Sequence, residues 1–332
     1  MRNLKVPAEL ARLFPELCEI TGCHDWAMTR GHLTRRDCAI YFLGASAFRI
    51  PKVVIKVLRN ATGRNKARDI HRKSLPFFQA ATAAFTIPEP LVPLGGGDAL
   101  AMEWIDAPLC GARLAKGFHR RATREAVLRG AGGWLGWFHS LNHVASEPFE
   151  ALAAFRKIEA IVEKIRQLDA DGLARDRWLA DYMKLAETCA RSIEGVALPH
   201  VRGHGDFTPF NCFIRGGTMI GFDYQVKRRF PVAHDICRFL VYLDVHRLLP
   251  ASAAELRESG CRASDLAIFM EAYGTPGPPA EKTLWLKLHF LELMRRIASL
   301  RLTRAKGRKR PFRMQEMARL RRNALHISSV LR

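Results

Sequence analysis

The sequence predicts an α+β protein with a small N-terminal part built on strands and a larger, mainly helical C-terminal part. Residues 38–43 and 52–58 are short apolar runs, the second of them rich in branched side chains, which is typical of strands. Beyond about residue 108, apolar residues recur at helical spacing instead. We therefore expect two lobes, formed by residues 1–105 and 106–332.

The composition of the chain is that of a folded globular protein. It has 332 residues, of which 48% are hydrophobic, which is enough for a large core and excludes a disordered chain. No apolar run reaches the length of a membrane span, and the N-terminal residues lack the apolar core of a signal peptide. We expect a cytoplasmic protein with no transmembrane segment.

The eight cysteines are scattered along the chain and include no CxxC pair. A zinc site is suggested by the neighbouring Cys18, Cys23 and His24. The sequence has no second pair of ligands at a spacing typical of zinc sites. We therefore expect buried free thiols and no disulfide framework.

The strongest functional signal is the polar segment His204–Asn211 together with Asp223. The residues between them predict a strand, a Gly216–Gly217 turn and a second strand, so an antiparallel hairpin would bring Asn211 and Asp223 side by side. Phosphoryl transfer needs such a set: one carboxylate, Asp206, orients the acceptor hydroxyl, while an amide and the other carboxylate hold a metal ion on the nucleotide phosphates. Ordinary capping and turn aspartates are the alternative, but they rarely reproduce three polar residues at this spacing.

This pattern, HGDxxxxN followed by an apolar hairpin that ends in Asp, resembles the motif of the aminoglycoside phosphotransferases. These enzymes share the protein-kinase-like fold with the choline, homoserine and fructosamine kinases. The resemblance implies a bilobal fold, with a small antiparallel-sheet lobe that binds nucleotide and a large helical lobe that binds substrate. It also implies ATP and Mg²⁺ as cofactors, Asp206 as the catalytic residue, and Asn211 and Asp223 as the metal ligands.

A lysine late in the second predicted strand is the candidate for binding the nucleotide phosphates. Lys56 alternates with Val54 and Leu58, so its face of the strand is otherwise apolar and its ammonium group needs an anionic partner. The position is similar to that of the strand lysine of the family, which pairs with the α- and β-phosphates. Lys52 is the competing candidate, and a lysine of an edge strand is the alternative without a function.

The region before Lys56 departs from the family pattern because it has no glycine-rich loop. A phosphate lid would have to be short, or built from polar side chains such as those of Thr34, Arg35 and Arg36.

The helix predicted after Lys56, at about residues 64–84, also departs from the family pattern because it contains no Glu. Asp69 and Gln79 are the only residues there whose side chains could bind the ammonium group of Lys56, and we favour Asp69. Both departures bear on activity more than on fold.

The strand predicted at residues 99–106 would lead into the hinge between the lobes. Gly95–Gly97 precede it as a turn, because no helix start and no Lys-Ser/Thr pair follows them as in a phosphate-binding loop. In the family, backbone groups after this strand hydrogen-bond adenine. The resemblance therefore implies Glu103, Trp104 and Ile105 as hinge residues.

Two further residues are implied as supports of the catalytic segment, His204 within the motif and Asp235 at the start of a later helix. In the family, the corresponding Asp accepts hydrogen bonds from the catalytic loop, and a carboxylate is also favourable beside a helix N-terminus. We interpret His139 as a core or capping residue and His234 as a neighbour of Asp235, not as a metal ligand.

The net charge of +21 is concentrated at the C-terminal end of the chain. Residues 295–332 contain thirteen Lys or Arg and one acid, Glu316, which accounts for +12 of the +21. Such a segment would attract nucleic acid, lipid head groups or a phosphorylated substrate. The alternative is a solvated face of the protein, because the segment also carries apolar residues at helical spacing that suggest packing: Met314, Met317, Leu320 and Leu325.

The late helices, which commonly line the substrate pocket in the family, are poor in acidic residues and rich in Arg. Acidic residues would select a polycationic aminoglycoside, so we favour a neutral or anionic hydroxyl compound as the acceptor. Two alternatives stay open: a catalytically silent kinase-like module that binds a ligand, and a protein that binds RNA or membrane through its basic C-terminus.

Overall fold

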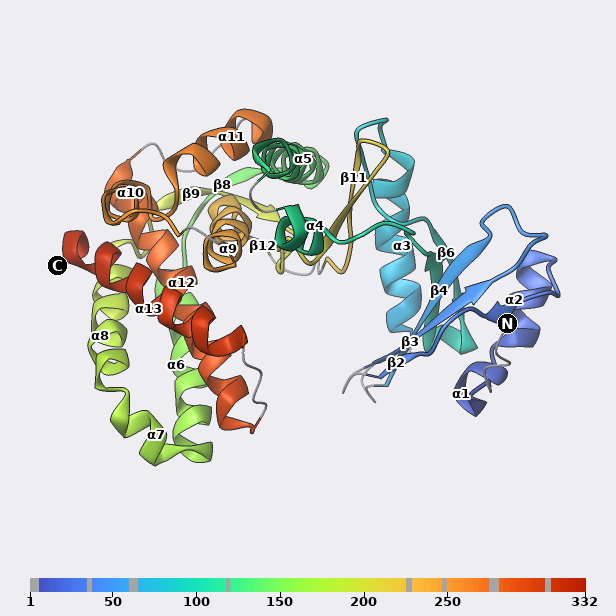
Figure 1. The fold of residues 1–332 in the computed structure, drawn as a ribbon, viewed down its shortest axis with the longest axis horizontal. Coiled ribbons are helices and arrows are strands. Elements are labelled where there is room, and N and C mark those ends of the chain that lie inside the picture. The colour runs from blue at the N-terminus through green and yellow to red at the C-terminus, as the bar shows by residue number, and fades with distance from the viewer. Residues whose placement is uncertain are drawn as a thin grey trace. The chain divides into compact units, whose positions relative to one another are not determined.

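The computed structural model describes residues 6–34, 38–59, 65–117, 120–224, 229–246, 250–274, 281–307 and 312–332. The chain divides into two compact units (Figure 1). The first comprises Met1–Ala107 and Phe213–Phe222, and the second comprises Pro108–Cys212 and Asp223–Arg332. A short segment from the middle of the second unit's sequence therefore completes the first.

The first unit contains an antiparallel sheet with the strand order β1-β3-β4-β7-β6, in which β2 also pairs with β3. The strands are β1 (Ala27–Met28), β2 (Leu33–Thr34), β3 (Cys38–Gly44), β4 (Lys52–Leu58), β6 (Pro90–Leu94) and β7 (Ala99–Glu103). Along β4, the buried residues Val53, Ile55 and Val57 alternate with partly buried ones, as expected for a strand with one face in the core. The two strands predicted at residues 38–43 and 52–58 are confirmed.

Two short helices, α1 (Ala8–Ala11) and α2 (Phe14–Thr21), share the hydrophobic core with this sheet. They are two helices and not one, because Pro15 has no N–H and its ring clashes with a helix that arrives from the preceding turn. Proline is tolerated in the first turn, so a new helix begins beside it. Later in the chain, α3 (Lys66–Gln79) contacts β6 and β7 of the same sheet.

The hairpin predicted after Asn211 is confirmed as β10 (Cys212–Arg215) and β11 (Thr218–Gly221). Gly216 and Gly217 both have positive φ angles, of 56° and 88°, which only glycine adopts without strain in a two-residue hairpin turn. β11 pairs in parallel with β5 (Phe85–Thr86) to make a three-stranded sheet.

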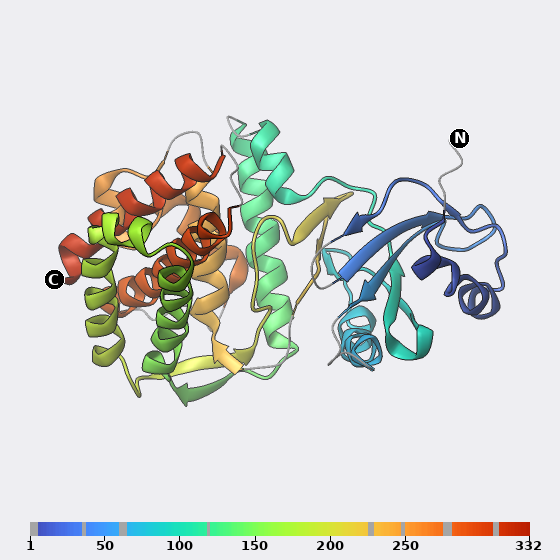
Figure 2. The same cartoon turned by 90° about the horizontal axis from the view of Figure 1, so that it is seen from below.

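The second unit is mainly helical, and Figure 2 shows several of its helices, coloured from green to red, packed side by side. They are α4 (Cys110–Gly117), α5 (Arg121–Ser140), α6 (Ala151–Leu168), α7 (Ala170–Arg175), α8 (Arg177–Ser192), α9 (Val232–Val245), α10 (Ala253–Ser259), α11 (Ala263–Tyr273), α12 (Lys282–Ala305) and α13 (Phe312–Leu331). A small antiparallel sheet with the order β12-β9-β8 lies before α9 in the chain; its strands are β8 (Ala145–Pro148), β9 (Ala197–Arg202) and β12 (Arg229–Pro231).

The basic C-terminal segment, residues 295–332, contains the end of α12 and the packed helix α13. On α13 the side chains of Leu320, Ala324 and Ile327 are fully buried, and the helix contacts α8, α10 and α12. Several arginines of this segment have internal partners; Arg301, for example, bonds to Asp169 and Asp176. Of the apolar residues at helical spacing, Leu320 is buried as predicted, whereas Leu325 is 55% exposed and does not pack in the core.

Candidate active site

The predicted catalytic loop, residues 204–211, follows β9, and its backbone is bonded to a buried carboxylate at the start of α9. Asp235 is completely buried and accepts hydrogen bonds from the backbone N–H groups of His204, at 2.7 Å, and Gly205, at 2.9 Å. A Cβ atom added at Gly203 would lie 2.5 Å from an Asp235 oxygen, so only glycine allows this close approach. Both N–H groups precede Asp206 directly, so Asp235 determines where the loop presents that residue.

Asp235 also contacts a histidine of α5, through the same Oδ2 atom that accepts the backbone N–H of His204. The Nε2 atom of His139 lies 3.3 Å from the carboxylate, and its Nδ1 atom lies 2.9 Å from the Tyr273 hydroxyl. Burial alone would raise the pKa of Asp235, but the hydrogen bond from His139 and the nearby histidine rings outweigh it and lower that pKa to about 2. His139 is therefore a core residue, as we predicted, and it contacts the carboxylate to which the loop backbone is bonded.

His204 supports the loop from within. Its side chain is completely buried among the rings of Trp134, Phe138 and Phe207, and its Nδ1 atom accepts the backbone N–H of Asp206 at 3.3 Å. The imidazole therefore anchors the loop in the core and does not face solvent.

Asp206 is the partly exposed carboxylate of the loop, with 48% of its side chain accessible. The Nδ2 atom of Asn211 donates to the Asp206 backbone carbonyl at 2.7 Å and reaches its Oδ2 atom at 3.3 Å. The Oδ1 atom lies 3.4 Å from Nη1 of Arg238, on α9. Each carboxylate oxygen thus has one partner and retains room for another.

Arg238 and Glu292 are site residues that the motif did not reveal. The Nε atom of Arg238 donates to Glu292 on α12 at 3.0 Å, and Glu292 also accepts hydrogen bonds from Arg295. Burial alone would raise the pKa of Glu292, but the two guanidinium groups hold it well below its usual range. A sequence signal did exist: Arg238 is a lone charge within the apolar run of residues 236–241, and such a residue needs a buried partner.

Asn211 and Asp223 lie at the two ends of the β10–β11 hairpin, on the chain that enters it and the chain that leaves it. Because the Nδ2 atom of Asn211 is bonded to Asp206, its Oδ1 atom is the oxygen left to face a cation. Asp223 is exposed and has a positive φ angle of 63°, a conformation that non-glycine residues adopt at a cost and often at functional sites. A carboxylate and an amide oxygen are the donors that Mg²⁺ accepts beside phosphate oxygens, so the pair fits this metal.

No cluster of three or more His, Cys, Asp or Glu side chains able to hold a metal occurs in the described part of the chain. The cysteines there are free thiols, most of them buried, and Cys23 donates to Asp25 at 2.7 Å.

Lys56, in the first unit, lies on the strand face opposite the core residues Ile55 and Val57. In the sheet it pairs with Ile40 on β3 and Leu100 on β7, so it occupies a central strand. Lys52, the competing candidate, forms an ion pair with Asp106 at the edge of the sheet.

Asp69, the favoured partner of Lys56, lies on the exposed side of α3. Its side chain is 57% accessible and forms an ion pair with Arg72 at 3.1 Å, whereas Ala67, Ser74 and Phe77 are the buried residues of the helix. Thr34 is exposed at the end of β2, and the other lid candidates, Arg35 and Arg36, lie outside the described residues.

The three hinge candidates differ in the use of their backbone N–H groups. Glu103 donates to the carbonyl of Glu89 at 2.9 Å, and Trp104 donates to that of Lys52 at 3.0 Å. The Glu103 side chain also pairs with Arg215 of the hairpin at 2.6 Å. Ile105 is buried and follows the last residue used by the sheet.

Residues 41–265 match the model of the phosphotransferase enzyme family, which also goes by the abbreviation APH. The chain belongs to this family. The match spans β3 to the start of α11, and so includes every site residue predicted above from Lys56 to Asp235. A comparison with curated protein sequences finds no match.

Solved structures with the fold of this phosphotransferase include small-molecule kinases. The choline kinase LicA from Streptococcus pneumoniae superposes with a TM-score of 0.60 at 10% identity, over 95% of this chain and 97% of that chain. The amicoumacin kinase hAmiN, in complex with AMP-PNP, Ca²⁺ and Ami, has a TM-score of 0.57 at 11% identity, over 89% and 87%. A fructosamine-3-kinase from Thermobifida fusca has a TM-score of 0.52 at 15% identity, over 94% and 97%. The expected kinase-like α+β fold is confirmed.

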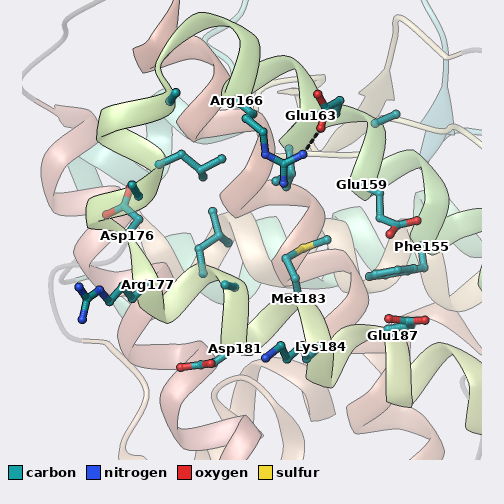
Figure 3. Close-up of a pocket in the computed structure, with 17 residues that line it drawn as sticks. Phe155, Glu159, Glu163, Arg166, Asp176, Arg177, Asp181, Met183, Lys184 and Glu187 are labelled. Carbon is teal, nitrogen blue, oxygen red and sulfur yellow. Dashed lines mark hydrogen bonds and ion pairs between the residues drawn. The ribbon is translucent and has the colours of Figure 1, made fainter.

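A cavity of about 1060 Å³ lies among α6, α7 and α8 in the second unit of this phosphotransferase. Figure 3 shows charged side chains around it, such as Glu163 paired with Arg166, over an apolar floor that includes Phe155 and Met183. None of the predicted site residues lines it. A smaller cavity of about 320 Å³ is lined by His234, Glu292 and Arg295, and so adjoins the contacts of Arg238. Separately, no helix in the described ranges is both long and apolar enough to cross a membrane.

Proposed function

We propose that this protein is an ATP- and Mg²⁺-dependent phosphotransferase that acts on a hydroxyl group of a small molecule. The observation that carries the proposal is the half-exposed Asp206 carboxylate on a loop fixed by the buried Asp235. In the transfer, the acceptor oxygen bonds to the γ-phosphorus while the bond from that phosphorus to the β–γ bridging oxygen breaks. ADP leaves with the electron pair, and the hydroxyl proton passes to Asp206.

Asn211 and Asp223 would hold the metal ion through one amide and one carboxylate oxygen. When bound, Mg²⁺ neutralises charge on the β- and γ-phosphates. The hydrogen bond from Asn211 to the Asp206 carbonyl links the metal ligand to the catalytic residue, so both are placed by the same short segment.

The first unit, in this proposal, is the nucleotide-binding lobe. Lys56 would neutralise the phosphate oxygens, with Asp69 as its proposed support. At the hinge, the N–H groups of Glu103 and Trp104 are engaged in the sheet, which leaves the N–H of Ile105 and the neighbouring carbonyls for adenine. Because ATP is the proposed donor, we place the reaction in the cytoplasm.

For the acceptor, we favour a neutral or anionic compound over a polycationic aminoglycoside. The acidic side chains described on α12 and α13, Glu292 and Glu316, are buried and paired with Arg238, Arg295 and Arg296. An amino group would find no open carboxylate on these two helices, whereas their arginines suit hydroxyl and anionic groups.

A two-step experiment tests the proposal on the full chain. Thermal melting with ATP should show stabilisation that depends on Mg²⁺, because a ligand that binds the native state raises the melting temperature. ADP release is then measured with glucose, glucuronate and glucosamine, which share one ring and differ in charge. Absence of any Mg²⁺-dependent stabilisation would refute the enzyme; turnover with glucosamine above both others would refute the acceptor preference.

A catalytically silent module is a second candidate, favoured by the exposed, Arg72-paired position of Asp69. It predicts ligand stabilisation with no ADP release from any acceptor. Binding of RNA or membrane through residues 295–332 is the third candidate, and it predicts steep salt dependence. Deletion of α13 would expose core residues, so the test of that surface is substitution of exposed Arg304 and Arg321 by Gln.

A further inference from the structure

Arg238 is a buried cation that connects the catalytic carboxylate to the helical core. We propose that Arg238 is a positioning residue that fixes the orientation of Asp206 for transfer, and that Glu292 acts on Asp206 through Arg238. The inference rests on the proposed function, because it concerns the carboxylate that would accept the hydroxyl proton.

The contacts form a chain from α12 to the catalytic loop. Glu292 binds the Nε edge of Arg238 at 3.0 Å, and the Nη1 atom of the same guanidinium lies 3.4 Å from Oδ1 of Asp206. Glu292 is itself fixed by Arg295, whose Nε atom lies 2.8 Å from Oε2 and whose Nη2 atom lies 2.5 Å from Oε1. Since a guanidinium is planar and its donors have fixed directions, fixing one edge also aims the other.

The exposure of the three side chains decreases toward the core. The accessible fraction of the side chain is 48% for Asp206, 6% for Arg238 and 3% for Glu292. A rigid buried pair thus supports a carboxylate that stays open to substrate. His234 also faces Glu292, at 3.6 Å from its Nδ1 atom, and no other described acid contacts Arg238.

A purely structural role explains this arginine poorly. Burying a guanidinium and a carboxylate has a desolvation cost, and an apolar pair of similar volume often stabilises a protein more. The residues on either side of Arg238 in the chain, Cys237 and Phe239, are apolar and buried, whereas His234 and Asp235 lie one turn before it on α9. An arginine at this point adds one thing that an apolar residue lacks: a fixed donor beside Oδ1 of Asp206.

The orientation matters because Oδ2 of Asp206 has a different partner. Asn211 donates to that atom at 3.3 Å, so the two oxygens are approached by two donors from different elements. Together these donors define the plane of the carboxylate and leave one lone-pair direction on each oxygen for the acceptor hydroxyl. Without Arg238 the side chain could rotate about its terminal bond, and the productive geometry would be populated less often.

The same unit contains a matched control. Arg301, on α12, is also buried and also joins two carboxylates: its Nε atom lies 2.7 Å from Asp176 and its Nη1 atom 2.9 Å from Asp169. Neither of these acids belongs to the catalytic loop. Arg301→Met therefore removes a buried guanidinium and its ion pairs with two partly exposed carboxylates without touching Asp206.

The test measures Mg·ATP hydrolysis, with water as the acceptor, for Arg238→Met, Glu292→Gln and Arg301→Met. We expect Arg238→Met to lower kcat roughly 10- to 100-fold with the KM for ATP within about twofold, because an interaction aimed at the reacting group is lost and nucleotide binding is not. Glu292→Gln should lower kcat less. Arg301→Met should lower stability but leave kcat close to that of the wild type.

Two further variants separate positioning from folding. Arg238→Met combined with Glu292→Leu removes the buried carboxylate that Arg238→Met would leave unpaired, and it should fold but stay slow. In an Asp206→Asn background, Arg238→Met should cause no additional loss, because both changes act on one carboxylate.

Equal kcat for wild type and Arg238→Met, or losses that multiply in the Asp206→Asn background, would overturn the positioning role alone. A wild type that melts at the same temperature with and without Mg·ATP and hydrolyses none would overturn the proposed function, and the positioning role with it.

Discussion

The catalytic loop and the sheet that carries Lys56 place their functional residues in different ways. Asp206 is approached by donors from its own loop and from α9, and the loop is bonded to the buried Asp235. Lys56 lies on a regular strand whose geometry follows from backbone pairing with β3 and β7. The position of Asp206 thus depends on a network of polar side chains, several of them buried. The position of Lys56 depends on the backbone hydrogen bonds of a sheet.

The difference has a physical consequence for substitution. In a buried polar network, removal of one partner leaves another unsatisfied, so stability and activity change together. On the open face of a sheet, removal of a side chain leaves the backbone pairing intact. We therefore expect changes around Asp206 to reduce stability and catalysis, and changes at Lys56 to reduce nucleotide affinity alone.

The largest expected effect is that of Asp206→Asn. The amide cannot accept the hydroxyl proton, so kcat should fall about 10³-fold, within the range of lost general-base catalysis. The Mg·ATP-dependent rise in melting temperature should persist, because Asp206 is not a metal ligand in our proposal. Steady-state ADP release and thermal melting measure the two quantities, and full turnover by the variant would contradict the role.

The next effect, on stability, is that of Asp235→Asn. The change replaces one acceptor oxygen by an NH₂ group and removes a buried charge that two N–H groups and His139 contact, so the unfolding free energy should fall by about 3 kcal/mol. Urea unfolding measures it. Asp69→Asn, on the exposed side of α3, is the control and should change the unfolding free energy by less than about 0.5 kcal/mol.

The dependence of stability on pH should also arise in the second unit. Burial lowers the pKa of His289, on α12, from 6.5 to about 4. Because the folded pKa is the lower one, the unfolded state binds the extra proton between these values, and stability decreases as pH falls from about 6.5 toward 4. His289 should account for a loss of about 2 kcal/mol at pH 5 relative to pH 7 or above. Urea unfolding of His289→Leu at both values should show a correspondingly flatter profile, and an unchanged profile would refute this assignment.

The smallest expected effect is that of Lys56→Met in the first unit. Loss of the ammonium group should raise the KM for ATP roughly tenfold, the value of one charge-assisted contact. The unfolding free energy should stay within about 0.5 kcal/mol. Lys52→Met, which removes the exposed ion pair with Asp106, is the matched control. A larger rise in KM for Lys52→Met would reverse the assignment of the phosphate-binding lysine.

Local patterns in the sequence were sufficient for the strands and most long helices. β3, β4 and the β10–β11 hairpin follow from alternating apolar residues and a Gly-Gly turn, because these signals act between neighbours in the chain. Such patterns do not show where a helix is interrupted by one or two residues. Pro15 separates α1 from α2, and Asp176, which pairs with Arg301, separates α7 from α8.

The sequence by itself determined the chemistry of the candidate site: the spacing of Asp206, Asn211 and Asp223 already specifies the groups that phosphoryl transfer needs. Only the tertiary structure decided what surrounds Asp206. Arg238 and Glu292 are 32 and 86 positions away from it in the chain, and no local pattern relates them. The packing of α9 against α12 places Glu292 beside Arg238. This contact matters because a buried charge is stable only when it is paired.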